Sequence, residues 1–205
     1  MRWTVCCVAN RSRPSRGTSA VGLPAPILTQ PNVPTEALQC NALSLYTFCT
    51  TTLKLIETDS PHLRRPFKNS PFGSTTFNFG PQVCTVPHKD LKNLSWGWCA
   101  VTSLGSYDHT KGGHLVLWDL NIAVEFPPHS TIFIPSAIVE HSNTAIQPDE
   151  SRMSITSYNS AGLFRWIAYG FMPKWLAELR GIRPQHWWSN PKHMFTKVPP
   201  SSVPT

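Results

Sequence analysis

A histidine and an aspartate two residues apart, His88 and Asp90, form the pair in this sequence with the clearest potential for chemistry. They stand in the stretch PHKDLKN. Side chains two apart in an extended chain project from the same face, so this pair would present an imidazole and a carboxylate together. Such a pair can supply two ligands to a metal ion, but it can also occur by chance. Its meaning depends on whether the chain supplies a third ligand.

Two other histidines have contexts that suit a third ligand. His114 follows KGG and opens the stretch HLVLWDL, and His141 lies in IPSAIVEHSN, 51 residues after Asp90. Two histidines and one carboxylate occupy one face of an octahedral ion and leave the opposite face open. This arrangement suits a non-haem Fe(II) ion that must bind a co-substrate and oxygen together.

The stretch RMS, eleven residues after His141, adds an anion-binding pair. Arg152 and Ser154 share one face of a strand, as any residues two apart do. An arginine fork can hold a carboxylate through two hydrogen bonds, and a neighbouring hydroxyl adds a third. The distal carboxylate of 2-oxoglutarate needs such an anchor while its 2-oxo acid end binds iron. The combination of both patterns predicts a site for Fe(II) and 2-oxoglutarate.

The segments that must position these residues are short and strand-like. Each is rich in β-branched and aromatic residues and is bounded by Gly, Pro, Asn or Asp. They are TTFNFG, QVCTVP, SWGWCAVTSLGSY, GHLVLWDL, IAVEFP, STIFIPS, RMSITSYNS and LFRWIAYG. Eight such runs without a long helix between them predict an antiparallel sandwich or barrel, with strands over about 75–170. We expect a hairpin turn around Asp119–Asn121, and a tight turn at FPPHST in which His129 stands where glycine would be more natural. PKWLAELRG predicts a helix that ends at Gly181.

Composition places this core between two basic flanks. Residues 71–163 carry a formal charge of −3, whereas residues 1–70 and 164–205 each carry +5, which gives the overall +7. Residues 1–35 contain no acid and predict either disorder or an organelle transit peptide. Residues 36–58 mix helical and strand character, and the sequence leaves them unassigned. Trp187 and Trp188 lie in the basic tail and could pack on the barrel or stack on nucleic acid.

We therefore divide the chain into a poorly defined, largely disordered or partial region 1–65, a catalytic domain 66–172, and a helix with a basic, proline-rich tail 173–205. The expected fold class is an all-β core with a short C-terminal helix and poorly ordered termini.

No secretory signal and no membrane span are evident, so we expect an intracellular protein, nuclear or cytoplasmic. Cys84 and Cys99 are expected to be reduced core residues, and the four tryptophans on strands, Trp96, Trp98, Trp118 and Trp166, are expected to pack in the core.

Residues 66–172 resemble the Fe(II)/2-oxoglutarate dioxygenase superfamily, and more narrowly its TET/J-binding-protein-like branch that is expanded in mushroom-forming fungi. The stretches that carry the resemblance are FNFGPQVCTVPHKDLKNL, WCAVTSLGSYD, GGHLVLWDL, IPSAIVEHSNTAI and RMSITSYNSAGLFRW. The resemblance implies a double-stranded β-helix (a jelly-roll or cupin-like fold). It implies iron ligands at His88, Asp90 and His141, and 2-oxoglutarate contacts at Arg152 and Ser154.

The resemblance also implies contacts with a target base. Asn93 completes H-x-D-x-x-N, and Tyr158 occupies the position of a base-stacking tyrosine; Asn93 could instead cap the loop after the metal strand, and Tyr158 could pack inside the barrel. Ser160 stands where animal TET enzymes carry a base-contacting histidine, and their zinc-binding cysteine region has no counterpart. The region before residue 66 does not match the family.

The function implied is hydroxylation of a C–H bond, with 2-oxoglutarate converted to succinate and CO2. The implied substrate is a methylated nucleobase in DNA, 5-methylcytosine or N6-methyladenine. Two alternatives remain open: the same chemistry on a protein side chain or small metabolite, or a metal-free barrel that serves as a binding module. The sequence does not determine the oligomeric state.

Overall fold

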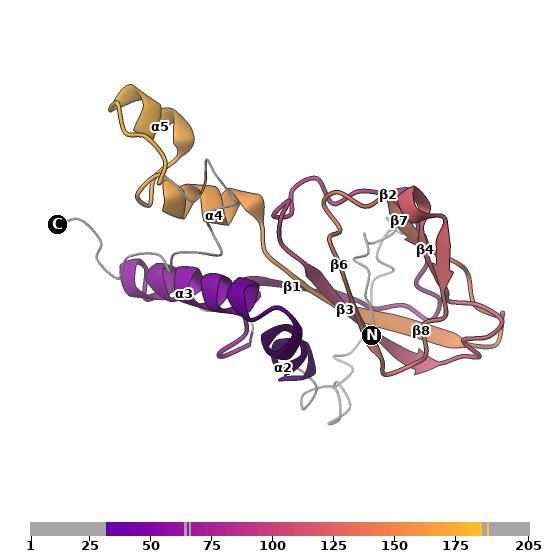
Figure 1. Cartoon of the computed structure of the whole chain (residues 1–205). Coiled ribbons are helices and arrows are strands. Elements are labelled where there is room, and N and C mark those ends of the chain that lie inside the picture. The colour runs from indigo at the N-terminus through magenta and orange to yellow at the C-terminus, as the bar shows by residue number, and fades with distance from the viewer. Residues whose placement is uncertain (1–31, 64, 66, 186–187, 189–205) are drawn as a thin grey trace, which may run out of the picture.

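The computed structural model describes residues 32–63, 65, 67–185 and 188. Helices and strands follow one another in a simple order: two helices, eight strands with one short 3-10 turn, and two further helices (Figure 1). Their bounds are α2 Asn32–Asn41, α3 Leu43–Asp59, β1 Ser74–Asn78, β2 Thr85–His88, β3 Cys99–Ser106, β4 Leu115–Leu117, η1 Trp118–Leu120, β5 Ile122–Val124, β6 Thr131–Ile134, β7 His141–Asn143, β8 Ser151–Tyr158, α4 Ala161–Ala168 and α5 Lys174–Leu179.

The strands form two antiparallel four-stranded sheets, which we call the major and the minor sheet. The major sheet has the order β1-β8-β3-β6 and the minor sheet the order β2-β7-β4-β5. The pairs are nested, because β4 pairs with β5, β3 with β6, β2 with β7 and β1 with β8. This order is that of a double-stranded β-helix, or jelly roll, so the predicted fold class is confirmed.

Apolar side chains fill the space between the two sheets. They alternate along each strand of the major sheet, as the two-residue period of a strand requires. The buried members of this inner cluster are Cys99, Val101, Leu115, Leu117, Phe126, Ile132 and Ile134. In the antiparallel pairing, Val101 lies opposite Thr156, and Gly105 lies opposite Arg152. The inner face of β8 therefore carries the even-numbered residues from Arg152 to Tyr158.

Helices pack beside one end of the major sheet (Figure 1). Their apolar side chains pack with Ala100 of β3 and Phe133 of β6, which point away from the inner cluster. Helix α3 contributes Leu45, Phe48, Cys49, Leu53 and Ile56, and helix α4 contributes Phe164, Ile167 and Ala168. The first six residues of β3 are all buried. Trp188 also packs against this outer cluster.

The helices α2 and α3 occupy residues 36–58, which the sequence left undecided between helix and strand. They begin at Asn32, inside the region expected to be largely disordered. The predicted domain limits at residues 65 and 172 remain predictions. The predictions for residues 1–31, for the tail beyond 188 and for Trp187 lie outside the described residues.

Several local predictions were wrong. The run LFRWIAYG was expected to be a strand, but it belongs to helix α4, where Phe164, Ile167 and Ala168 recur at helical spacing and pack on α3. The strands therefore end at Tyr158 and not near residue 170. Strand β7 was missed because it is only three residues long and contains no β-branched or aromatic residue.

Side-chain burial corrects two further expectations. Cys99 is buried as predicted, whereas Cys84 is exposed and its thiol contacts the backbone oxygen of Asn143 at 3.2 Å. Trp96, Trp98 and Trp166 are partly buried against the outer cluster. Trp118, which was also assigned to the core, is 47% exposed because it lies on the 3-10 turn η1 and not in a strand.

The predicted turns and the C-terminal helix agree with the structure. Strands β4 and β5 form the expected hairpin, and Asn121 has a left-handed backbone with φ of 52°. His129 has φ of 61°, which explains why glycine would be natural there. Helix α5 is followed by Gly181 with φ of 68°. No helix in the described part of the chain is both long and apolar enough to cross a membrane.

Candidate metal centre

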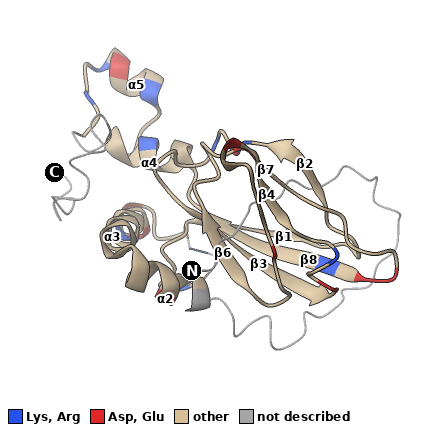
Figure 2. Cartoon of the chain, turned by 45° about the vertical axis from the view of Figure 1, so that its right-hand side comes forward, with Lys and Arg blue, Asp and Glu red and all other residues tan. Residues whose placement is uncertain are grey.

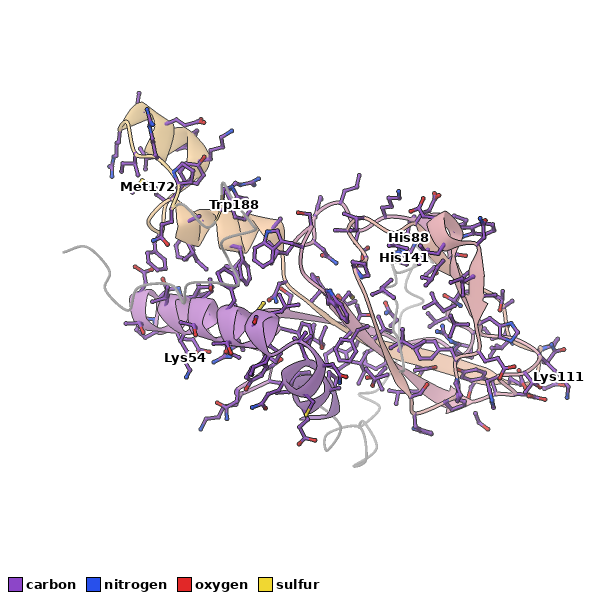
Figure 3. The ribbon with its side chains drawn as sticks, in the orientation of Figure 1. Lys54, His88, Lys111, His141, Met172 and Trp188 are labelled. Carbon is purple, nitrogen blue, oxygen red and sulfur yellow. The ribbon has the colours of Figure 1, made fainter. Side chains whose placement is uncertain are left out.

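His88 and His141 lie close together at one end of the minor sheet (Figure 3). Asp90 joins them in one cluster. His88 ends β2 and His141 begins β7, and the two residues are directly paired in the antiparallel ladder. Each of the three residues offers a ligand atom, and these atoms all lie within 4.8 Å of one another. The Nε2 atom of His88 is 3.7 Å from Oδ1 of Asp90. His141 is therefore the third member of this cluster.

The two histidine rings are held in the same way. The Nδ1 atom of His88 lies 2.7 Å from the backbone oxygen of Val86, and that of His141 lies 2.7 Å from the oxygen of Val139. A carbonyl oxygen can only accept a hydrogen bond, so each Nδ1 carries a proton, and in a neutral ring Nε2 then carries the lone pair. Such an outer hydrogen bond is what fixes the tautomer and orientation of metal-binding histidines.

Asp90 is held by the loop that follows β2 and by the end of β6. Its backbone N–H donates to the oxygen of Ser136 at 2.9 Å. The side-chain amide of Asn93 donates to Oδ2 of Asp90 at 3.1 Å. Oδ1, which faces His88, is thus the carboxylate oxygen presented to the site.

Arg152 is the largest fully buried side chain in the described part of the chain, with 1% of its surface exposed. It lies on the inner face of β8, and its guanidinium carbon is 5.6 Å from the ring centre of Phe126. Its Nη1 donates to the oxygen of Val83 at 3.0 Å, but its Nε and Nη2 have no hydrogen-bond partner. A buried guanidinium with two unmatched donors is costly unless an anion pairs with it. The space between the sheets therefore favours an anionic ligand.

The polar residues beside Arg152 form a stripe between the sheets. Ser154 is buried, and its hydroxyl oxygen accepts a hydrogen bond from Nδ2 of Asn78 at 3.0 Å. That bond leaves the hydroxyl proton of Ser154 to donate to another group. The Oδ1 of Asn78 and the Oγ1 of Thr156 are buried without partners. Sequence reasoning missed Asn78 and Thr156; their register opposite or beside Ser154 is the signal that identifies them.

The two residues assigned to substrate contact lie near each other. Asn93 and Tyr158 border a gap together with Ser136 and Trp98, and this gap is too small to hold a water molecule. Tyr158 packs against the inner cluster, and its hydroxyl lies 3.4 Å from the hydroxyl of Thr76. Asn93 closes a turn, because its backbone N–H donates to the oxygen of Asp90 at 2.8 Å. The structure thus brings both residues to the same place.

Sequence reasoning also missed the residues of η1 that brace the centre. The carboxylate of Asp119 is 3.0 Å from Nζ of Lys89 and accepts the backbone N–H of Glu140 at 2.7 Å. These two bonds, the N–H of Glu140 first, lower the pKa of Asp119. Trp118 donates through Nε1 to the hydroxyl of Ser142 at 3.0 Å. The turn therefore fastens the strand that carries His141.

Charges are evenly mixed over the described part of the chain (Figure 2). All eleven Asp and Glu residues lie in it, but only eleven of the eighteen Lys and Arg residues do, so this part is formally neutral. The excess of +7 therefore comes from Arg and Lys residues outside the described part, most of them in the flanks. Segments around the triad expose large apolar side chains, among them Val86, Leu91, Trp118 and Ile138.

Comparisons with known proteins add likenesses to two solved structures. No family model matches the chain, and no curated protein matches it. NgTET1 in complex with 5mC DNA is 20% identical, with a TM-score of 0.41 over 61% of this chain and 54% of that chain. The viral collagen prolyl hydroxylase vCPH from Paramecium Bursaria Chlorella virus-1, in its 2OG complex, is 11% identical, with a TM-score of 0.32 over 53% of this chain and 69% of that chain. The chain thus spans about half the length of the NgTET1 structure.

Proposed function

We propose that this protein is an Fe(II)- and 2-oxoglutarate-dependent dioxygenase that hydroxylates a C–H bond. The observation that carries the proposal is a pair of sites inside one jelly roll. His88, Asp90 and His141 gather at one end of the minor sheet, and the buried Arg152 on the facing major sheet has two unmatched donors. A metal site alone needs no buried arginine. A dicarboxylate co-substrate needs a metal ion to bind its 2-oxo acid end and an arginine to pair with its distal carboxylate.

The residues present fit these groups. Two imidazoles with protonated Nδ1 atoms and one carboxylate, without a thiolate, form a donor set that suits Fe(II) and leaves ligand positions open. Iron together with 2-oxoglutarate and O2 supplies the oxidant, and the products are hydroxylated substrate, succinate and CO2. Arg152 would bind the distal carboxylate through Nε and Nη2, and Ser154 would donate its hydroxyl proton to the same group.

We further propose a methylated nucleobase in DNA, 5-methylcytosine or N6-methyladenine, as the substrate. The support is the resemblance of residues 66–172 to the TET/J-binding-protein-like branch, together with the proximity of Asn93 and Tyr158 to each other and of Asn93 to Asp90. A base in a duplex must be flipped out of the stack to reach such a site. Because the described part is neutral, the basic flanks would supply the attraction for phosphates. With this substrate the protein would act in the nucleus or cytoplasm.

The test is an anaerobic titration with Fe(II) and 2-oxoglutarate, in which the charge-transfer absorption of the ternary complex is followed. Succinate release is then measured with oxygen present. Variants His88→Ala and Asp90→Ala should lose iron binding and turnover while their circular dichroism spectra stay like that of the wild type. Succinate release at the wild-type rate in either variant would contradict the assignment of the triad.

One observation favours a second substrate class, a protein side chain or small metabolite. The described part has no net charge, and the segments around the triad expose apolar side chains. Binding to methylated DNA should weaken steeply as salt rises if DNA is the substrate. Binding that is weak at low salt, with 2-oxoglutarate turnover still stimulated by peptides or metabolites, would favour the second class.

A further inference from the structure

The amide of Asn93 spans two neighbours of the candidate metal centre. Its Nδ2 donates to Oδ2 of Asp90 at 3.1 Å and to the hydroxyl of Ser136 at 3.1 Å. Ser136 is 1% exposed and also accepts the backbone N–H of Asp90 at 2.9 Å. Asp90 is therefore fastened at its backbone by Ser136 and at its carboxylate by Asn93.

The chemistry of the amide fixes which way round it lies. An amide nitrogen has two N–H donors and no lone pair to offer, whereas the amide oxygen only accepts. Rotation of Asn93 by half a turn would place its oxygen beside the acceptor Oδ2 of Asp90, which is repulsive. Both donors are consequently used within the protein, and any contact between Asn93 and a substrate would be made through its oxygen.

The contact decides which oxygen of the aspartate faces the ion. Oδ2 of Asp90 is engaged by Asn93, while Oδ1 lies 3.7 Å from Nε2 of His88. Loss of the amide would let the carboxylate rotate about its last bond, and both oxygens could then turn toward the ion. The loop itself would keep its shape, because the backbone N–H of Asn93 also bonds to the oxygen of Asp90.

We propose that Asn93, supported by Ser136, is a positioning residue that holds Asp90 in a one-oxygen mode toward the metal. This inference rests on the proposed metal site and adds a role for Asn93 that a substrate contact would not require. It predicts a defect in the binding of the metal alone, without any substrate or co-substrate. A residue that only touched a substrate would leave that binding unchanged.

The experiment is an anaerobic titration of the full chain with Co(II), which replaces Fe(II) and reports coordination through its visible absorption bands. Asn93→Ala should weaken Co(II) binding by about 10- to 100-fold, the usual effect of removing a partner of a metal ligand. The absorption bands of the remaining complex should shift, because the carboxylate changes its mode of binding. Asn41→Ala is the control: Asn41 also donates a hydrogen bond through Nδ2, to the backbone oxygen of Ala37 at 2.8 Å, but it lies on helix α2. Its affinity and spectrum should equal those of the wild type.

A second variant keeps the test decisive if Asn93→Ala fails to fold. Ser136→Ala removes the hydroxyl that steadies the amide and leaves the backbone bond to Asp90, so a smaller loss of about 2- to 10-fold is expected. Wild-type affinity and bands in Asn93→Ala, or in Ser136→Ala if only that variant folds, would overturn the role of Asn93 and leave the metal site intact. If the wild-type chain itself bound no Co(II) or Fe(II), the proposed function would fail together with this inference.

Discussion

Asp119 and Glu140 are joined by a hydrogen bond of 2.7 Å, from the backbone N–H of Glu140 to Oδ2 of Asp119. The same oxygen lies 3.0 Å from Nζ of Lys89. Lys89 stands between the two candidate ligands that end and follow β2, and Glu140 directly precedes the third. One carboxylate on the turn η1 therefore links the backbone segments that carry the whole triad.

We predict that Asp119→Ala weakens metal binding by no more than about tenfold, because Asp119 acts through neighbours of the ligands and not on the ligands themselves. Metal titration of the variant measures this. Asp108→Ala is a matched control, since Asp108 also pairs with a lysine, Lys111, at 2.8 Å, and Lys111 lies far from the two histidines in Figure 3. An equal loss in both variants would show that Asp119 has no particular link to the centre.

Arg152→Met should impair binding of 2-oxoglutarate without destabilising the fold. Without an anion, the buried charge with its unmatched Nε and Nη2 contributes little stability, so the apo variant should unfold at the same denaturant concentration as the wild type or a higher one. Its affinity for 2-oxoglutarate in the presence of iron should fall about thirty- to several-thousand-fold, which corresponds to about 2–5 kcal/mol. Iron binding should persist.

Two further variants serve as comparisons for Arg152→Met. Arg152→Lys should recover only part of the affinity for 2-oxoglutarate, because an ammonium group cannot reproduce the two-pronged contact. Arg165→Met, on the exposed side of helix α4, should change neither the affinity nor the apo stability. Unchanged co-substrate affinity in Arg152→Met would remove the anchoring role.

Gly105→Ala should destabilise the major sheet beside Arg152. Gly105 has φ of 109°, and a Cβ there would lie 2.3 Å from the oxygen of Ser151. Backbone strain of this kind costs about 1–3 kcal/mol, and the steric overlap adds to it. Gly170→Ala provides the comparison, because its φ of 72° is strained while nothing lies within 4 Å of the added Cβ. Urea unfolding of both variants measures the two losses of stability. An equal loss in Gly170→Ala and Gly105→Ala would show that the overlap of the Cβ with the oxygen of Ser151 adds nothing to the backbone strain.

The ion pair of Glu57 and Arg65 predicts how stability depends on pH. Arg65 donates from Nε and Nη2 to the two oxygens of Glu57 at 2.7 and 2.9 Å, and this contact lowers the pKa of Glu57. The stability it contributes is complete above the unfolded pKa of about 4.3 and is lost as the pH falls through the lower folded value. Because the Glu57 side chain is 36% exposed, we expect about 1 kcal/mol or less.

The measurement is the free energy of unfolding of the wild type and of Glu57→Gln between pH ~6 and pH ~3. The difference between the two proteins should shrink as the pH falls. Glu178→Gln, which breaks an exposed pair with Lys174 at 3.4 Å, should differ little from the wild type throughout. A difference for Glu57→Gln that stays constant with pH would contradict the ion-pair explanation.

The sequence was informative where spacing alone determines geometry. Arg152 and Ser154 had to share a face of β8, because side chains alternate along a strand. His88 ends β2, but Asp90 lies in the loop after it, so the expectation that both belong to one strand was wrong although their spacing still brings them together. The choice of His141 over His114 rested on the resemblance and on its context, and the ladder pairing of His141 with His88 agrees with that choice.

Tertiary contacts determined what the sequence left open. Helix α4 was read as a strand because its aromatic and β-branched residues favour strands, and its packing on α3 overrides that propensity. The bonds of Asn93 to Ser136 and of Asp119 to Glu140 join residues 43 and 21 positions apart, so no local pattern predicts them.

The nested pairing of the strands has a consequence for synthesis on the ribosome. The hairpin of β4 and β5 closes over a few residues, whereas β2 pairs with a strand that begins at His141, and β1 with one that ends at Tyr158. A growing chain can therefore close its innermost hairpin early, but β1 and β2 remain without partners until much of the polypeptide has emerged. Long-range pairings of this kind form slowly and leave strand edges exposed in the meantime. The centre would thus be completed only after β7 has emerged, and the edges of β1 and β2 would stay exposed until their partner strands have been made.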